Sequence, residues 1–218
     1  MKQIITKSLQ DIFSPSVITF VLKIAGLSLI STVVISWLLW DMLFKVIHTY
    51  MTWLPWEWLT ATVTSLASVL VGYTLFIIMV SLFTSLMSET LLVKLSKKHY
   101  PLIPIAGSAD VATSVSVTLK SSGIFLLLFI VLLPVLFIPV LGQVVMLYLW
   151  SILLKEPTVY DVGSLFITDK TLLKEKSKKS TFIAMIGSLF NYIPILNIFA
   201  PVFAQILFLH YLQRKNIA

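Results

Sequence analysis

The sequence contains no cysteine, so disulfides, zinc–thiolate sites and thiol nucleophiles are excluded. Charged residues are also scarce: they make up 11% of the 218 residues, against about a quarter in an average soluble domain. The hydrophobic share of 58% is more than a soluble core of this size could bury. The composition therefore indicates an integral membrane protein, and the length fits a single membrane domain, 1–218.

Motifs for catalysis and cofactor binding are absent as well. The chain has no Gly-x-Ser-x-Gly elbow, no His-Glu-x-x-His pair and no Walker loop. His48, His99 and His210 have no carboxylate partner at metal-ligand spacing, so we expect each to be an interfacial residue. We expect no catalytic residue, no metal site and no cofactor, and therefore not an enzyme. The net charge of +7 lies in loops without an aromatic-interleaved basic face, which argues against nucleic acid as a partner.

Long charge-free stretches divide the chain into four blocks, and the first two are uninterrupted. The first covers Ile24 to Trp40 and extends back across Lys23, and the second covers Trp58 to Ser88. Each is long enough for a helix to cross about 30 Å of hydrocarbon. We therefore expect transmembrane helices at 17–47 and 58–95, preceded by an amphipathic interfacial helix at 3–13.

The third and fourth blocks, 121–154 and 180–213, are interrupted by prolines near their middle. Proline removes a helical hydrogen bond and clashes with the preceding turn, so we expect a chain reversal in each block. The interrupting residues are Pro134 and Pro139 in the third block, and Pro194 and Pro201 in the fourth.

The two interruptions also repeat a short pattern. The stretch from Phe137 to Gly142 reads Phe-Ile-Pro-Val-Leu-Gly, and the stretch from Tyr192 to Asn197 reads Tyr-Ile-Pro-Ile-Leu-Asn. Gly142 and Asn197 stand where a helix ending in the left-handed region would need them. We interpret the two blocks as a repeated helical hairpin.

The turns of these hairpins carry no charge and almost no polar side chain, so we expect them to stop partway through the membrane. Backbone at such a turn must be covered by protein or by a water-filled cavity, which implies subunit packing, a pore or both. The predicted fold is an all-α integral membrane protein with two long transmembrane helices and two proline-broken, partly penetrating helical hairpins.

The distribution of charge predicts an orientation. Apart from Lys23 and Lys45, every Lys and Arg would fall on one side of this arrangement, which places both termini in the cytoplasm. The basic segment 156–179, and 170–179 above all, would face anionic lipid. Tryptophans gather at the opposite interface, as expected of an aromatic belt: Trp37, Trp40, Trp53, Trp56 and Trp58.

Polar residues at membrane depth are the candidates for a site. Each could line an ion path, because ionisable and polar groups inside a membrane are often functional. Each also has a structural interpretation: Lys23 could extend to the interface, Glu89 could lie at the surface, and the amides could cap broken helices. The candidates are Lys23, Glu89, Gln143, Asn191, Asn197 and Gln205.

The order of these elements resembles the CysZ family of the etoposide-induced-protein superfamily, over roughly residues 8 to 213. Phe137 to Gly142 is similar to its Phe-x-Pro-x-x-Gly element, and Tyr192 to Pro201 resembles its closing Ile-Pro-x-x-Asn-x-x-x-x-Pro element. Phe83, Leu86 and Glu89 resemble its Pro-Phe-x-x-x-x-x-x-Glu stretch, with Leu82 in place of the proline, and Tyr160-Asp161 falls in its Tyr-x-Asp-like region.

The resemblance implies two full spans, two partly penetrating hairpins, a homo-oligomer, and sulfate movement across the bacterial inner membrane. One departure concerns the substrate: where sulfate-associated members have a Pro-Gly-Leu-Arg-Arg-like start to the first span, this chain has Pro15 to Thr19 without arginine. We expect a permease or channel for sulfate or a related small anion. The alternative is a non-transporting membrane protein that organises partners or lipids.

Overall fold

The computed structural model describes residues 2–51, 57–136, 138–169, 171–173, 175, 180–193 and 196–215. Within these ranges the chain is helical and has no β-strand. The α-helices are α1 (Lys2–Ile12), α2 (Pro15–Met51), α3 (Glu57–Met87), α4 (Glu89–His99), α5 (Val111–Leu136), α6 (Leu141–Gly163), α8 (Thr181–Ser188) and α9 (Ala200–Lys215). Two short 3-10 helices, η1 (Leu189–Tyr192) and η2 (Leu196–Phe199), join α8 to α9.

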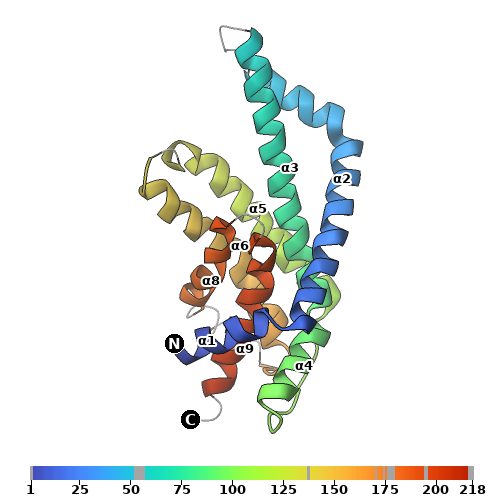
Figure 1. Cartoon of the computed structure of the whole chain (residues 1–218), viewed down its shortest axis with the longest axis vertical. Helices are drawn as coiled ribbons and strands as arrows, with labels where there is room; N and C mark the ends of the chain where they lie inside the picture. The colour runs from blue at the N-terminus through green and yellow to red at the C-terminus, as the bar shows by residue number, and fades with distance from the viewer. Residues whose placement is uncertain are drawn as a thin grey trace.

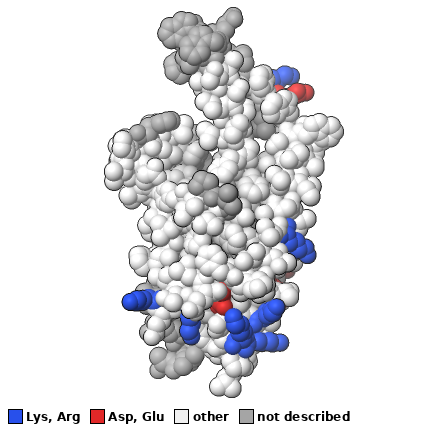
Figure 2. Space-filling view, viewed as in Figure 1, with Lys and Arg blue, Asp and Glu red and all other residues white. Residues whose placement is uncertain are grey.

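Four helical segments are long and apolar enough to cross a membrane: Pro15–Met42, Thr60–Met87, Val111–Leu136 and Leu196–Gln213. In Figure 1, α2 and α3 form a long pair that extends beyond the other helices at one end of the molecule. At the opposite end α1, α4 and α9 gather, and Figure 2 shows Lys and Arg concentrated there. The prediction of an all-helical, multi-pass membrane protein is confirmed.

The four segments differ in how far they are covered by the rest of the chain. In the most hydrophobic 18 residues of each segment, the rest of the chain buries 22% in Pro15–Met42, 22% in Thr60–Met87 and 17% in Val111–Leu136. The buried share in Leu196–Gln213 is 78%. Three segments thus expose apolar side chains that suit lipid or another subunit. The α9 segment is instead the centre of the packed end.

The hydrophobic core lies around α9. Phe203 and Phe208 of α9 are fully buried against Ile12 of α1, Leu92 of α4 and Val162 of α6. In α4, Leu91, Leu92 and Leu95 lie on one face, and this apolar face packs into the same cluster. The packing holds α1, α4 and α6 around a common axis.

The predicted helix 58–95 is wrong as a single element, because α3 ends at Met87 and α4 begins at Glu89. The backbone bends at Ser88, which still donates to the carbonyl of Thr84 at 2.9 Å. The physical reason is a change of pattern: α3 has no charged residue after Glu57 and carries apolar residues on every side, whereas α4 is amphipathic. It buries Leu91, Leu92, Leu95 and Ser96 and turns its lysines outwards, so it must follow the core rather than the axis of α3.

The first hairpin is longer than the predicted 121–154. Its arms are α5 with 26 residues and α6 with 23, or about 39 and 35 Å as helices. The added turns are polar and packed, with Ser114, Thr118 and Asp161 buried. The segment 157–165 is therefore mostly buried, not at an interface with lipid as expected for 156–179. In Figure 1 the α5–α6 turn nevertheless lies well short of the far end of α3.

The turn of this hairpin corrects one prediction. The residue in the left-handed region is Val140, with φ 65°, and neither Gly142 nor Asn197 has a positive φ. Gly142 instead lies in the first turn of α6, where a β-carbon would collide with the carbonyl oxygen of Leu136. Glycine is required there for close approach of the two arms, not for its handedness.

The prolines occupy different positions relative to the reversals. Pro134 lies inside α5, two residues before its end, and Pro139 lies in the turn itself. Pro201 is the second residue of α9. In the first turn of a helix a backbone N–H has no helical acceptor, so proline, which lacks that N–H, is tolerated there. Pro194 lies outside the described residues.

Candidate functional site: a buried polar centre around Asp161

The packed end of the molecule contains two facing stripes of hydroxyl side chains. One stripe consists of Ser81, Thr84 and Ser85 on α3 with Ser88 just after it, and the other of Ser114, Thr118, Ser121 and Ser122 on α5, all buried. Residues three and four apart share a helical face, so each stripe runs along one side of its helix. The two helices pack against each other, and they enclose polar side chains in an otherwise apolar protein.

Asp161, in the last turn of α6, is the acceptor at the middle of these stripes and is 2% exposed. Ser85 of α3 donates to its Oδ2 at 2.6 Å, and Ser114 of α5 donates to its Oδ1 at 3.1 Å. Gln205 Nε2 of α9 donates to Oδ2 at 3.0 Å. Four helices thus meet at one carboxyl group, which we call the Asp161 centre, together with Ser85, Ser114 and Gln205.

The electrostatics of the Asp161 centre follow from its neutral surroundings. Asp161 lies beyond the apolar stretch of α6 and outside the four candidate spans. Burial raises the pKa of Asp161 to about 7, although the hydrogen bonds from Ser85, Ser114 and Gln205 act in the opposite direction. No Lys, Arg or His within the described ranges hydrogen-bonds to this carboxyl group. The carboxyl group of Asp161 therefore holds its proton to a higher pH than an exposed aspartate does.

A small cavity of about 30 Å³ adjoins the centre and is lined by Ser85, Ser88, Glu89, Ser114 and Asp161, among others. A volume of this size has room for a water molecule held by polar neighbours. Glu89, the first residue of α4, thus lies beside Asp161 across this cavity.

A larger cavity of about 260 Å³ lies between α3 and the α5–α6 hairpin. Its walls are mainly apolar, with Phe125, Phe129 and Trp150, and its polar groups include Tyr73 and Gln143. Aromatic walls without charge cannot replace the hydration shell of an ion.

The two hairpins meet beside this larger cavity. The hydroxyl of Tyr192 donates to the carbonyl of Gln143, and the rings of Tyr192 and Trp150 stand edge to face with centroids 4.9 Å apart. The side-chain amide of Asn197 donates to the hydroxyl of Tyr73. These contacts tie the 3-10 helices η1 and η2 to α6 and to α3.

The candidate residues from the sequence therefore separate into groups. Gln205 and Glu89 lie at or beside the Asp161 centre, and Gln143 and Asn197 lie near the larger cavity. Asn191 is buried in η1. Lys23 is exposed on α2 and joins neither group.

Asp11, which the sequence reasoning missed, is the acceptor of a second polar cluster. It is 2% exposed in the last turn of α1 and binds Lys98 at 3.1 Å, His99 at 2.9 Å and His210 at 3.0 Å. Burial by itself raises the pKa of Asp11, but the hydrogen bonds from His210, His99 and Lys98 lower it well below its usual value.

The expectation that the histidines lack a carboxylate partner is therefore wrong for His99 and His210. Asp11 is 88 residues from His99 and 199 residues from His210, so spacing along the chain could not reveal the cluster. A local signal existed for Asp11 alone, because Ile4, Ser8 and Ile12 form a buried face on α1 that includes position 11. The side chain of His48 lies outside the described ones.

Comparison with known proteins identifies the family. A family model described as Sulfate transporter CysZ/Etoposide-induced protein 2.4 matches residues 4–201, from the first turn of α1 to the start of α9. Neither the curated proteins nor the solved structures that were compared gave a match. The family is described as one of transporters, and the match confirms the resemblance found in the sequence. The chain belongs to the EI24 family of membrane proteins, the family of the sulfate transporter CysZ.

Proposed function

We propose that the chain is an inner-membrane permease for sulfate or a related small anion, and that the Asp161 centre lies on its ion path. Membership of the family supports transport as the activity. The observation that carries the position of the path is the cluster of donors from α3, α5 and α9 around a single carboxyl group.

The chemistry of the centre is compatible with an anion when Asp161 is protonated. A neutral carboxylic acid does not repel an oxyanion, and hydroxyls freed from it donate hydrogen bonds to oxygen. Ser85 and Ser114 would then turn from Asp161 to the anion as it passes. The ionised form of Asp161 would bind the same hydroxyls and oppose entry, so proton occupancy would regulate passage.

For topology, we propose that α2 and α3 cross the whole membrane, whereas the hairpin α5–α6 and the hairpin of α8 with α9 reach only part of its depth. Two observations support this arrangement: the α5–α6 turn lies short of the far end of α3, and basic residues gather at the opposite end. The gathered charge favours cytoplasmic termini in a bacterial inner membrane.

A homo-oligomer accounts for the exposed apolar faces and for the partial depth of the hairpins. Backbone at a hairpin turn inside the membrane needs cover from protein or water, which a neighbouring subunit provides. Anionic lipid is the proposed neighbour of the basic end, including segment 170–179, most of which lies outside the described residues.

The test is uptake of radiolabelled sulfate into proteoliposomes that contain the purified protein, against empty liposomes. We expect uptake that excess unlabelled sulfate suppresses more than chloride or phosphate does. Ser85→Ala and Ser114→Ala each remove a donor, which we expect to lower uptake about tenfold if the hydroxyl contacts the anion. Ser65→Ala is the matched control on α3, because Ser65 is exposed and bonds only its own helix at Ala61.

The outcome decides between two functions. Uptake that falls in the serine variants and persists in Ser65→Ala supports both the permease and the path. Uptake that is equal in all variants keeps the permease and removes the path from the Asp161 centre. Folded, correctly oriented protein without uptake contradicts sulfate transport.

Absence of sulfate uptake would favour the second function, in which the protein organises partners or lipids in the membrane. One observation favours it already: the α1–α2 junction presents serines instead of arginines, with Ser14 and Ser16 hydroxyls 3.4 Å apart. Hydroxyls alone lack the charge that arginine offers to an oxyanion.

A further inference from the structure

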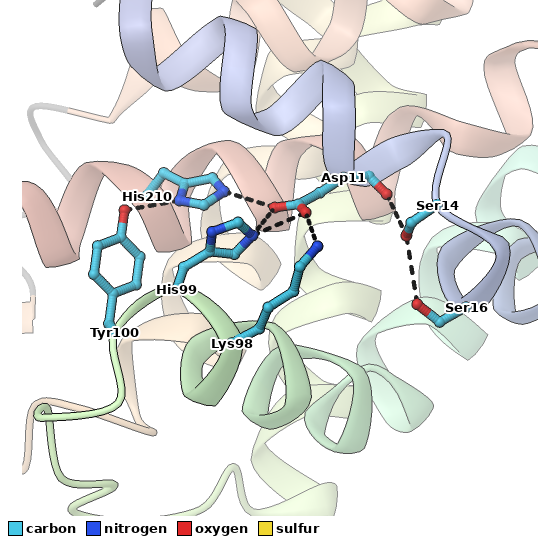
Figure 3. Close-up of polar contacts among 7 residues, drawn as sticks. All are labelled: Asp11, Ser14, Ser16, Lys98, His99, Tyr100 and His210. Atoms are coloured by element: carbon cyan, nitrogen blue, oxygen red, sulfur yellow. Dashed lines mark hydrogen bonds and ion pairs between the residues drawn. The ribbon is translucent and has the colours of Figure 1, made fainter.

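Three elements far apart in the sequence each bring one potential metal ligand to the same point (Figure 3). Asp11 comes from the last turn of α1, His99 is the last residue of α4, and His210 lies in α9. The Nε2 atoms of His99 and His210 lie 2.9 and 3.0 Å from the Asp11 carboxylate. The three ligand atoms all lie within 4.8 Å of one another.

We propose that Asp11, His99 and His210 bind one divalent transition-metal ion such as Zn²⁺. Imidazole nitrogen and carboxylate oxygen are the ligands that zinc takes in proteins that lack cysteine. Tetrahedral zinc, with bonds of about 2.0 to 2.2 Å, holds its ligand atoms about 3.3 Å apart. The two separations from Asp11 are within a few tenths of an ångström of that value, and the two histidine nitrogens, within 4.8 Å of each other, would adjust towards it as the ion binds, with water in the fourth position.

Tyr100 supports this assignment as an orienting partner for one ligand. Its hydroxyl lies 2.8 Å from Nδ1 of His210, whose side chain is 1% exposed. Metal-binding histidines almost always donate their second ring N–H to an oxygen, which fixes the ring and directs the other nitrogen to the metal. Figure 3 shows His210 held in this way between Tyr100 and Asp11.

Lys98 offers a way to distinguish a metal site from a cluster of ion pairs. Its Nζ lies 3.1 Å from Asp11 Oδ1, and its side chain is 58% exposed. An exposed lysine can move into water at little cost, so a metal ion can displace it from the carboxylate. Lys98 and the metal would compete for Asp11, which makes the effect of removing Lys98 opposite in sign to that of removing a ligand.

The consequence for the fold is a cross-link among three helices. A bound ion would join the N-terminal helix α1 to α4 and α9, in addition to the apolar contacts of Ile4 and Ile12 with the core. The site does not depend on transport, because none of its ligands contacts the Asp161 centre.

The experiment is a calorimetric titration of the full-length, detergent-purified protein with Zn²⁺, after chelator treatment and with an affinity tag that contains no histidine. We expect one ion per chain, verified by mass-spectrometric metal analysis, and a visible d–d absorption when Co²⁺ replaces Zn²⁺. Asp11→Asn and His99→Gln should each weaken binding at least about 100-fold, and Tyr100→Phe about 10-fold.

Two further variants sharpen the test. Lys98→Met should tighten Zn²⁺ binding, because it removes the competing charge. The third histidine supplies the matched control, since His48→Gln, in α2, should leave affinity and stoichiometry unchanged.

Either of two results overturns the proposal: folded wild-type protein that binds neither Zn²⁺ nor Co²⁺ stoichiometrically, or Asp11→Asn protein that binds as tightly as wild type. If Asp11→Asn fails to fold, His99→Gln decides, because His99 is only half-buried and tolerates the change better.

Discussion

The two buried aspartates of this protein have opposite surroundings. Asp11 meets Lys98, His99 and His210, which stabilise its charge, and its pKa falls well below the usual value. Among the described residues, the carboxyl group of Asp161 accepts hydrogen bonds from the neutral side chains Ser85, Ser114 and Gln205, and burial raises its pKa to about 7. Both side chains are 2% exposed, but Asp161 lies deeper among other atoms than Asp11 does. Deeper burial raises the pKa of Asp161, whereas the hydrogen bonds from His210, His99 and Lys98 lower that of Asp11.

The comparison assigns different roles to the two regions. A carboxylate that accepts hydrogen bonds from a lysine and two histidines joins helices, as Asp11 joins α1 to α4 and α9. A carboxyl group that changes charge near neutral pH in a nest of hydroxyls can respond to protons and ions. Stability is therefore expected at the α1–α4–α9 contact, and function at the Asp161 centre.

The largest expected effect is a loss of stability when the contacts of Asp11 are removed. Asp11→Ala leaves buried His210 without its carboxylate partner, and removal of one partner from a buried pair costs about 3 kcal/mol or more. We expect the lowest melting temperature among the variants discussed, measured in detergent with chelator present. Asp169→Ala is the control, because Asp169 is exposed and its carboxyl group bonds the adjacent Thr171 and Leu172, not a distant helix. Equal losses in the two variants would contradict a joining role for Asp11.

The second effect is a pH dependence of the free energy of unfolding, caused by Asp161. Its pKa is about 7 in the folded protein, against an ordinary value of 3.8 for aspartate in an unfolded chain, so the folded state binds the proton more tightly. The stabilisation is therefore complete below about pH 4 and is lost as pH rises through 7. Its full size is on the order of a few kcal/mol, since one pKa unit corresponds to about 1.4 kcal/mol.

Asp161→Asn isolates this contribution, because asparagine has nearly the same shape and does not titrate. We expect the free energy of unfolding of the wild type, minus that of Asp161→Asn, to fall between pH 5 and pH 8. Denaturant titrations at both pH values measure it. A difference that stays flat or rises with pH would show that Asp161 is ionised throughout.

The smallest effect concerns single donors at the Asp161 centre. Ser114→Ala removes one hydrogen bond, which costs about 1 kcal/mol against a neutral acceptor and up to about 3 against an ionised one. We therefore expect Ser114→Ala to destabilise more at pH 8 than at pH 5. Ser122→Ala is the matched control on the same helix, because its buried hydroxyl has no partner among the described residues. A pH-independent cost for Ser114→Ala would place its hydroxyl outside the titrating centre.

The same contrast explains what the sequence could predict. Apolar runs are local, so the candidate spans within α2 and α3, and the reversal at Pro139, followed from composition and from proline chemistry. The break at Ser88 was missed because the change from all-apolar α3 to amphipathic α4 takes place without glycine or proline.

The site required contacts that no local pattern encodes. Asp161 was noticed only through its place in the family resemblance, and its burial depends on Ser85, Ser114 and Gln205, which lie 76, 47 and 44 residues away. Gln205 was a candidate because amides are rare in apolar blocks, and the structure gives it Asp161 as a partner. Lys23 had the same signal, yet it lies exposed on α2.

The central claim is that Asp161 exchanges its proton near neutral pH while Asp11 does not. Infrared difference spectroscopy between pH 5 and pH 9 tests it directly, because a protonated carboxyl group has a separate C=O stretching band. We predict a band at pH 5 that disappears with a midpoint near pH 7, is lost in Asp161→Asn and is retained in Asp11→Asn. A spectrum without that band in the wild type, or with the band intact in Asp161→Asn, would contradict the account.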